Sequence, residues 1–231
     1  MLFRKTLAWC VHGYTALGLL AAAGMAVLIV YGGDRNFRAA FALMLIATAI
    51  DASDGWLARR VQVKELTPSF DGRRLDDLID FQTYTSLPLL LIWRSNMLPE
   101  DWSWLLLVPL LASAYGFSQA EAKTADNFFL GFPSYWNVVA FYLYYLQPVA
   151  WISLLIILSL AALTFVPLKY LYPSQKGPYA LLTNVLGIAW AILVVVILLY
   201  RPVEVRTLVL LSLFYPIYYL IVSWMVSLRT R

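Results

Sequence analysis

Long stretches without a charged side chain constrain this chain more than any other feature of its sequence. From Leu7 to Tyr31, for example, there is no Asp, Glu, Lys or Arg. A helix that crosses a bilayer needs about 20 predominantly apolar residues, and several segments meet that requirement. Hydrophobic residues make up 62% of the 231 positions and charged residues only 13%, whereas soluble domains are about one quarter charged. The sequence therefore predicts an integral membrane protein with a single domain.

Clusters of polar residues, glycine and proline divide the chain into eight predicted helices. These helices cover residues 7–31, 37–60, 71–94, 102–122, 134–147, 150–171, 179–200 and 205–227. We therefore expect an all-α integral membrane protein, an eight-transmembrane-helix bundle whose fifth helix is short.

The distribution of basic residues predicts how this bundle is oriented. An even number of spans places both termini on the same side of the membrane. Of the 17 Lys and Arg residues, 12 fall on that side and 5 on the other. Because Lys and Arg are enriched on the cytoplasmic side, both termini are predicted to be cytoplasmic. The net charge of +4 then reflects topology and contact with anionic lipid, not binding to nucleic acid.

Two pairs of aspartates interrupt the apolar pattern in the second and third predicted helices. Asp51 and Asp54 are three residues apart, and Asp76 and Asp80 are four apart. At about 100° per residue, each pair falls on one helical face. A carboxylate within a bilayer costs about 2.5–3.5 kcal/mol on insertion scales, so intramembrane acids are expected to be functional.

The two acidic faces are predicted to meet. Asp51 and Asp80 lie at similar distances along their helices from Arg38 and Arg94, about 20 Å at a rise of 1.5 Å per residue. Because the helices run antiparallel, we expect the four carboxylates to converge in a cavity nearer the cytoplasm. Such a cavity could hold hard divalent cations, which prefer oxygen ligands, and two bridged ions would suit phosphoryl chemistry. A buried ion-pair network or a proton relay remains the alternative from the residues alone.

The spacing of these residues resembles a known signature. The pattern Asp51-x2-Asp54-Gly55-x2-Ala58-Arg59-x12-Gly72-x3-Asp76-x3-Asp80 is similar to that of the CDP-alcohol phosphotransferases. It covers residues 51–80, and most of that family has a shorter gap between the arginine and the second glycine. The longer gap, the eight spans and the stretch "DNFFLGFPSYWN" at 126–137 resemble the bacterial phosphatidylcholine synthase branch.

The resemblance implies an enzyme of the cytoplasmic (inner) membrane of bacteria, with residues 1–231 as one transmembrane catalytic domain. Its active site would face the cytoplasm and transfer the phosphatidyl group from CDP-diacylglycerol to choline, releasing CMP. Two divalent ions, Mn²⁺ or Mg²⁺, would be held by Asp51, Asp54, Asp76 and Asp80. The resemblance assigns CDP-diacylglycerol binding to Asp54, Gly55, Ala58, Arg59 and Gly72. Asp80 would be the general base that takes the proton of the acceptor hydroxyl.

Choline carries a fixed positive charge, which aromatic faces hold best with the aid of a carboxylate. The segment near 115–136 is predicted to be a cytoplasmic loop rich in aromatic side chains. Its candidate choline-binding residues are Tyr115, Glu121, Asp126, Phe129, Tyr135 and Trp136. Aromatic residues also gather at membrane interfaces for other reasons, so packing is the competing interpretation for each of them.

Three other functions stay open at this stage. The acceptor could be serine, glycerol phosphate or inositol phosphate, because Arg60, Arg73 and Arg74 could hold a phosphorylated alcohol. A membrane prenyltransferase also uses Asp-rich motifs, but its motifs normally lie far apart in the chain. A cation transporter would need acidic residues throughout the membrane depth, whereas here they are confined to two helices. A homodimer is also left open. The only histidine, His12, is interpreted as a packing residue or an interfacial hydrogen-bond partner.

Overall fold

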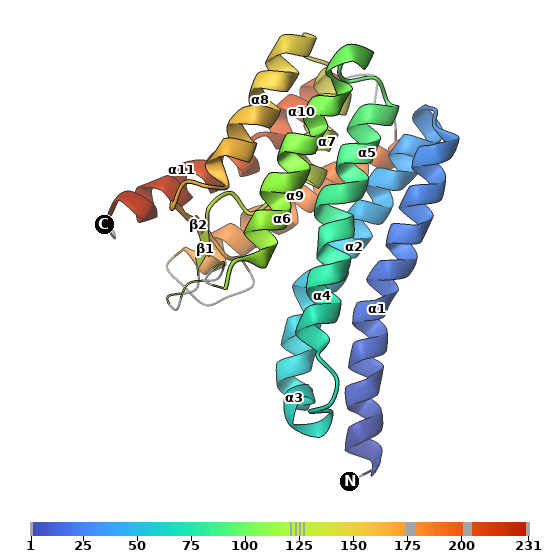
Figure 1. Ribbon diagram of the computed structural model, residues 1–231, viewed down its shortest axis with the longest axis vertical. Helices are drawn as coiled ribbons and strands as arrows, with labels where there is room; N and C mark the ends of the chain where they lie inside the picture. The colour runs from blue at the N-terminus through green and yellow to red at the C-terminus, as the bar shows by residue number, and fades with distance from the viewer. Residues whose placement is uncertain are drawn as a thin grey trace.

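The computed structural model describes residues 2–120, 122, 124, 126, 128–173, 179–200 and 205–229. Its regular structure is almost entirely helical, as predicted (Figure 1). The elements are α1 (Leu2–Tyr31), α2 (Asp34–Val61), α3 (Val63–Leu66), α4 (Gly72–Asp80), η1 (Phe81–Ser86), α5 (Leu87–Arg94), η2 (Glu100–Leu106), α6 (Leu107–Ser118), β1 (Phe128–Leu130), α7 (Trp136–Leu146), α8 (Ala150–Leu163), β2 (Lys169–Leu171), α9 (Ala180–Tyr200), α10 (Val205–Ser212) and α11 (Phe214–Arg229).

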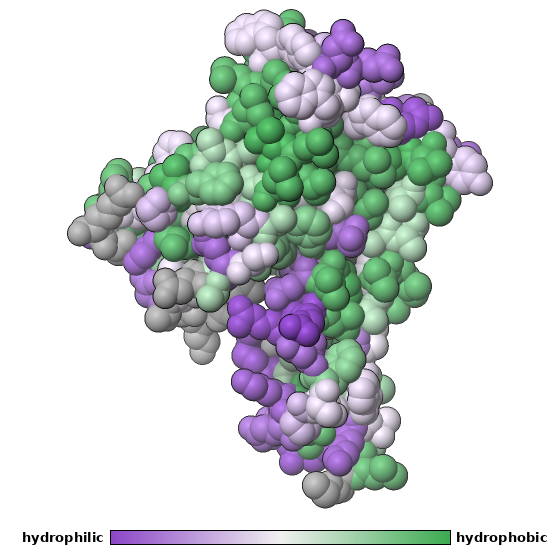
Figure 2. All heavy atoms as spheres, viewed as in Figure 1, coloured by the Kyte–Doolittle hydropathy of each residue, from purple (hydrophilic) through white to green (hydrophobic). Residues whose placement is uncertain are grey.

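Four helical segments among the described residues are long and apolar enough to cross a membrane. They are Leu2–Tyr31, Asp34–Val61, Ala180–Tyr200 and Val205–Arg229. Helix α8 is apolar but shorter. In Figure 2, hydrophobic side chains cover the upper part of the visible face, and hydrophilic ones gather over α4 and the lower end of the molecule. This division is what a protein that sits in a bilayer with one polar end requires.

Helices α1, α2 and α4 lie side by side at the polar end of the molecule (Figure 1). Small residues of α1 make this approach possible. A Cβ on Gly18 would lie 2.7 Å from Cγ2 of Ile79, and a Cβ on Gly24 would lie 2.9 Å from Leu43. Since real Cβ atoms do not come so close to other carbons, α1 uses glycine where α4 and α2 pack against it.

The predicted helix 71–94 is one continuous rod, but its middle turn is widened. Helices α4 and α5 are joined without a break by η1, a π-helical turn. Segments of this type usually occur as a single turn within an α-helix, often at functional sites. The rod therefore changes its side-chain register just after Asp80.

The predicted helix 150–171 is wrong in its last third. Helix α8 ends at Leu163, four residues before Pro167, whose ring would clash with the carbonyl of Leu163 in a continued helix. Residues 169–171 form β2 instead, which pairs antiparallel with β1 so that Phe129 is opposite Tyr170. The fold therefore contains a small strand pair where the sequence predicted only helix and loop.

Two further boundaries differ from the prediction. The helix predicted over 102–122 ends at Ser118, which places Tyr115 on α6 and not in a loop. The helix predicted over 205–227 is broken at Leu213 into α10 and α11. Pro216 explains this break, because its ring cannot coexist with a regular helical carbonyl at Ser212, four residues earlier.

Helix α11 supplies hydrogen-bond partners to strand β2. The backbone N–H groups of Lys169 and Leu171 donate to the hydroxyls of Ser227 and Ser223, each at 3.0 Å, and the hydroxyl of Tyr219 donates to the carbonyl of Leu171 at 2.8 Å. Four residues of helix rise about 6 Å and two residues of strand about 6.6 Å, so the two spacings match. The helix thus covers a strand edge that would otherwise carry unsatisfied polar groups.

The contact between α11 and β2 predicts a specific loss of stability. Replacing Ser223 by Ala leaves the buried N–H of Leu171 without its acceptor, which should lower the free energy of unfolding by about 1–3 kcal/mol. Thermal unfolding of the detergent-purified protein measures the change. Ser159→Ala, at an exposed serine of α8, is the control and should leave the melting temperature nearly unchanged. Equal melting temperatures for the two variants would contradict the stabilising role of this contact.

Candidate metal and substrate site

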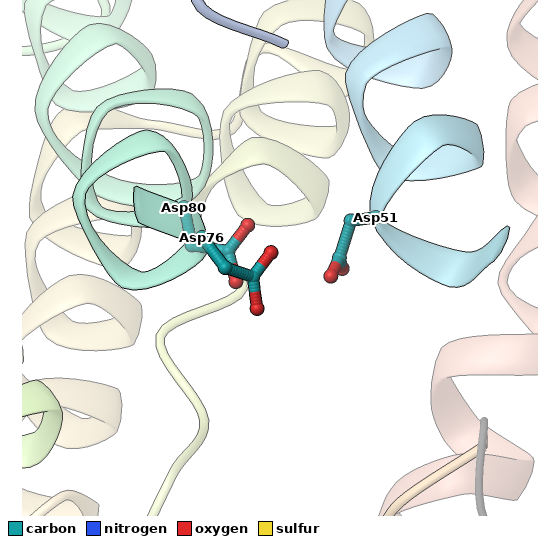
Figure 3. Close-up of side chains that lie close together, drawn as sticks. All are labelled: Asp51, Asp76 and Asp80. Carbon is teal, nitrogen blue, oxygen red and sulfur yellow. The ribbon is translucent and has the colours of Figure 1, made fainter. Parts of the chain in front are cut away.

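Three aspartates from two helices meet in one cluster. Single carboxylate oxygens of Asp51, Asp76 and Asp80 all lie within 4.8 Å of one another, and all three residues are half-buried. Figure 3 shows that Asp76 and Asp80 project from α4 toward the Asp51 carboxylate, which projects from α2 on the other side. The predicted meeting of the two acidic faces is confirmed for these three residues.

The fourth predicted acid, Asp54, is placed differently. It is buried, with 6% of its surface exposed, and its Oδ2 accepts a hydrogen bond of 2.7 Å from the hydroxyl of Thr15 on α1. A three-residue step turns an α-helix by about 300°, so Asp54 lies about 60° around α2 from Asp51. A four-residue step leaves Asp76 and Asp80 only about 40° apart. This difference in spacing accounts for the orientation of Asp54 toward α1.

The donor set fits a divalent cation. Mg²⁺ and Ca²⁺ bind oxygen ligands at about 2.0–2.6 Å, so the ligands of one ion lie within roughly 5 Å of one another. The cluster meets that limit with carboxylate oxygens, the ligands that hard cations prefer. Asp51, Asp76 and Asp80 are therefore the residues that could hold an ion in this part of the molecule.

Tyr84 is a member of this site that the sequence analysis missed. Its hydroxyl donates a 2.7 Å hydrogen bond to Oδ2 of Asp51. It follows Asp80 by four residues, as Asp80 follows Asp76, so the continuing four-residue step was the signal that could have identified it. Thr15, which holds Asp54 from α1, left no comparable signal because its only distinction is a hydroxyl in an apolar helix.

The motif residues on α2 beyond the aspartates occupy two different surroundings. A Cβ on Gly55 would lie 3.4 Å from Nη1 of Arg59, so the Arg59 guanidinium folds back along α2 by one turn and stays on the exposed surface. Ala58 is half-buried and packs against a small apolar cluster formed by Ala8, Val11 and Val63. Arg59 is thus available to an anionic ligand, and Ala58 lies where α2 meets α1.

The long gap between Arg59 and Gly72 is a folded connection. Helix α2 ends at Gln62, which adopts a left-handed conformation (φ 60°) and donates its N–H to the carbonyls of Ala58 and Arg59. The single helical turn α3 follows, and Asp71 then caps α4 by accepting the backbone N–H of Arg74 at 3.1 Å.

His12 fastens this connection to α1. Its Nε2 lies 3.0 Å from the hydroxyl oxygen of Thr67. Because that hydroxyl donates to the carbonyl of Val63, the imidazole is the donor to Thr67. The imidazole also packs against the ring of Phe70, with centroids 4.4 Å apart. A Cβ on Gly72 would lie 2.7 Å from Cε1 of His12, so Gly72 is required for the approach of this ring. The interpretation of His12 as a packing and hydrogen-bonding residue is confirmed.

The residues predicted to bind choline are dispersed. Tyr115 on α6 packs against Phe165, and Phe129 on β1 packs against Tyr172. Trp136 has no exposed surface and donates its indole N–H to Ser113. Glu121 lies outside the described residues.

Asp126 and Tyr135 differ in their relation to the acidic cluster. Asp126 forms an ion pair of 2.6 Å with Lys169 at the strand pair, and the hydrogen bond from Lys169 lowers the pKa of this carboxyl below its ordinary value. Tyr135 has its ring centroid 6.0 Å from that of Tyr84 and 5.8 Å from that of Tyr219. Ring contacts therefore link Tyr135 to the residue that hydrogen-bonds Asp51.

Comparison with known proteins bears on what this arrangement does. The profile of the CDP-alcohol phosphatidyltransferase family matches residues 13–166, which include the whole of the 51–80 motif. The chain is 36% identical over 201 residues to a phosphatidylcholine synthase of Pseudomonas aeruginosa, covering 87% of this chain and 83% of that protein. It is 39% identical to a phosphatidylcholine synthase of Borreliella burgdorferi, covering 73% of this chain and 71% of that protein.

A further relative is a phosphatidylcholine synthase of Legionella pneumophila, 39% identical over 73% of this chain and 66% of that protein. Only 12 residues precede the segment that the family profile matches, so the 201-residue match also extends beyond Val166. The similarity to the Pseudomonas protein therefore includes part of the region that contains α9 to α11.

The contact between His12 and Gly72 predicts a rescue. Gly72→Ala should reduce catalytic activity strongly, because the added methyl group would displace His12 or shift the start of α4 and with it Asp76. Adding His12→Ala to this variant removes the clash and should restore part of the activity. Initial rates of the two single variants and the double variant measure the coupling. If the double variant is no more active than Gly72→Ala alone, the clash with His12 is not the reason for glycine at this position.

Proposed function

The chain belongs to the CDP-alcohol phosphatidyltransferase family, and we propose that it is a phosphatidylcholine synthase. In the proposed reaction the hydroxyl oxygen of choline attacks the phosphorus of the phosphatidyl group in CDP-diacylglycerol. The bond between that phosphorus and the oxygen of the CMP phosphate breaks, the hydroxyl proton passes to the enzyme, and CMP leaves. The products are phosphatidylcholine and CMP.

The convergence of Asp51, Asp76 and Asp80 within 4.8 Å is the observation that carries this proposal. A diphosphate substrate brings negative charge to a site that is already acidic, so the site needs cations. We propose that the three carboxylates, together with Asp54, hold Mn²⁺ or Mg²⁺, with two ions bound in the active enzyme. Bound divalent ions would neutralise the phosphate oxygens and favour the departure of CMP.

The chain's own residues would bind the substrate and move the proton. Arg59, exposed beside Gly55, would hold a phosphate oxygen of the nucleotide, with Gly55, Ala58 and Gly72 lining the pocket. Asp80 would accept the proton of the choline hydroxyl. It belongs to the cluster and is half-buried, so its carboxylate can reach a substrate there without full exposure to water. A general base of this kind contributes about 10²–10⁴ to the rate.

The choline ammonium would bind beside Tyr135. This residue is the one among the described choline candidates whose ring contacts reach Tyr84 and hence Asp51. Aromatic faces attract a quaternary ammonium, and the acidic cluster adds negative potential on the same side. Tyr115, Asp126 and Phe129 would act at most at the entrance, and the burial of Trp136 favours a packing role.

The orientation in the membrane follows from the basic residues. Eight spans with both termini in the cytoplasm would place the 51–80 motif near the cytoplasmic face of the bacterial inner membrane, where CDP-diacylglycerol headgroups and choline are accessible. The hydrophilic end of the molecule in Figure 2, which α4 shares, supports this orientation.

A panel of acceptors tests the function. Purified protein in lipid nanodiscs with labelled CDP-diacylglycerol should release CMP with choline and form phosphatidylcholine. It should do so far more slowly with serine, glycerol phosphate or inositol phosphate. Activity should disappear on chelation of divalent ions and return with Mn²⁺ or Mg²⁺. Preferred use of another alcohol would replace the proposed acceptor, and full activity after exhaustive chelation would exclude a metal-dependent reaction.

Substitutions at Asp80 and Asp51 should separate chemistry from binding. An amide cannot accept the hydroxyl proton, so Asp80→Asn should slow single-turnover CMP release by about 10²–10⁴. Its affinity for CDP-diacylglycerol should fall much less, because the amide retains the shape and one oxygen ligand. Asp51→Asn should weaken CDP-diacylglycerol binding directly through the metal site. A near wild-type rate for Asp80→Asn with choline would show that another group is the base.

A further inference from the structure

We propose that Tyr84 and Thr15, two hydroxyl residues outside the 51–80 motif, are positioning residues for the metal site. Each donates a hydrogen bond to one carboxylate of α2 and fixes its orientation: Tyr84 holds Asp51, and Thr15 holds Asp54. This inference rests on the proposed function, because it takes Asp51 and Asp54 to be metal ligands.

The geometry of Tyr84 fits this role. Only 7% of its surface is exposed, so its hydroxyl is removed from water and needs a partner within the protein. That partner is the Asp51 carboxylate at 2.7 Å, the length of a charge-assisted hydrogen bond between a hydroxyl and a carboxylate. The bond crosses from the rod that carries Asp76 and Asp80 to the helix that carries Asp51, so it also sets the distance between the two halves of the cluster.

The π-helical turn explains how Tyr84 reaches across. Tyr84 lies within η1, between Phe81 and Ser86. A π turn contains an additional residue, which changes the direction of side chains relative to a regular helix and is found frequently at functional sites. In this chain the widened turn begins directly after Asp80, and the tyrosine within it contacts Asp51.

Thr15 performs the matching task from α1. Both Thr15 and Asp54 are buried, at 8% and 6% exposure, and their hydrogen bond measures 2.7 Å. A buried carboxylate is costly without hydrogen-bond donors. The Thr15 hydroxyl supplies one and fixes the rotation of the Asp54 carboxylate about its Cβ–Cγ bond.

These bonds matter because the acidic groups repel one another. Without a donor on Oδ2, the Asp51 carboxylate would be free to rotate away from Asp76 and Asp80, and a metal ion would have to bring it back on binding. Hydrogen-bond partners of metal ligands typically contribute 10- to 100-fold to metal affinity. A purely structural role predicts something else: loss of stability with no specific change in metal binding.

Direct metal titration tests the role of Tyr84. Mn²⁺ is added to substrate-free protein in nanodiscs, and the loss of the free-ion signal in electron paramagnetic resonance gives the dissociation constant. Tyr84→Phe keeps the ring and its contact with Tyr135 but removes the donor, and should weaken Mn²⁺ binding about 10- to 100-fold. The Mn²⁺ concentration for half-maximal CMP release should rise by a similar factor, while kcat at saturating Mn²⁺ stays close to the wild-type value.

Tyr142→Phe is the matched control. This substitution also removes a buried tyrosine hydroxyl with two hydrogen-bond partners, Ser212 and Trp190, but it touches no residue of the motif. Its Mn²⁺ affinity should equal that of the wild type, even if its melting temperature falls. An equal loss of affinity in Tyr142→Phe and Tyr84→Phe would mean that general loosening of the fold, and not orientation of Asp51, causes the effect.

Thr15 is tested by a conservative pair. Thr15→Val keeps the shape without the hydroxyl and should weaken Mn²⁺ binding, whereas Thr15→Ser keeps the donor and should restore most of the affinity. Wild-type affinity in both Tyr84→Phe and Thr15→Val would overturn the inference. Asp51→Asn separates this outcome from failure of the proposed function: if the wild type binds no better than Asp51→Asn, the metal site itself is wrong and the inference falls with it.

Discussion

Mutual repulsion among Asp51, Asp76 and Asp80 is the constraint on which the rest of the structure depends. Two carboxylates 4.8 Å apart repel by about 3 kcal/mol at an effective dielectric constant of about 20. Three such pairs amount to a large fraction of the 5–15 kcal/mol that stabilises a typical domain. Apolar packing throughout the bundle must therefore hold together two helices that their own acidic faces drive apart, and a bound cation would remove the conflict.

Helix α1 contributes to this balance although it carries no motif residue. Thr15 bonds to Asp54, His12 bonds to Thr67 in the connection between the two halves of the motif, and Gly18 admits Ile79 of α4. These contacts lie along one side of a single helix, spaced three residues apart. Helix α1 thus acts as a rigid brace against which α2 and α4 are both aligned.

Much of the site could be predicted because helical spacing is local information. The three- and four-residue steps of the aspartates placed them on helical faces, and the antiparallel connection brought Asp51 to Asp76 and Asp80. Contacts that depend on a distant partner could not be predicted, such as Gly72 against His12 or Asp54 against Thr15. The strand pair was missed for a related reason. Residues 128–168 contain no charged side chain, and an apolar run does not reveal that its two ends pair as strands.

The three-residue ladder of α11 has a consequence for how this chain can change in evolution. Tyr219, Ser223 and Ser227 reach β2 only because each follows the last by four residues. An insertion or deletion of one residue within this stretch would rotate everything beyond it by about 100° and break the ladder at once. Substitutions on the outer face of α11 leave the ladder intact. Sequence drift is therefore tolerated there, whereas the number of residues between Tyr219 and Ser227 is fixed.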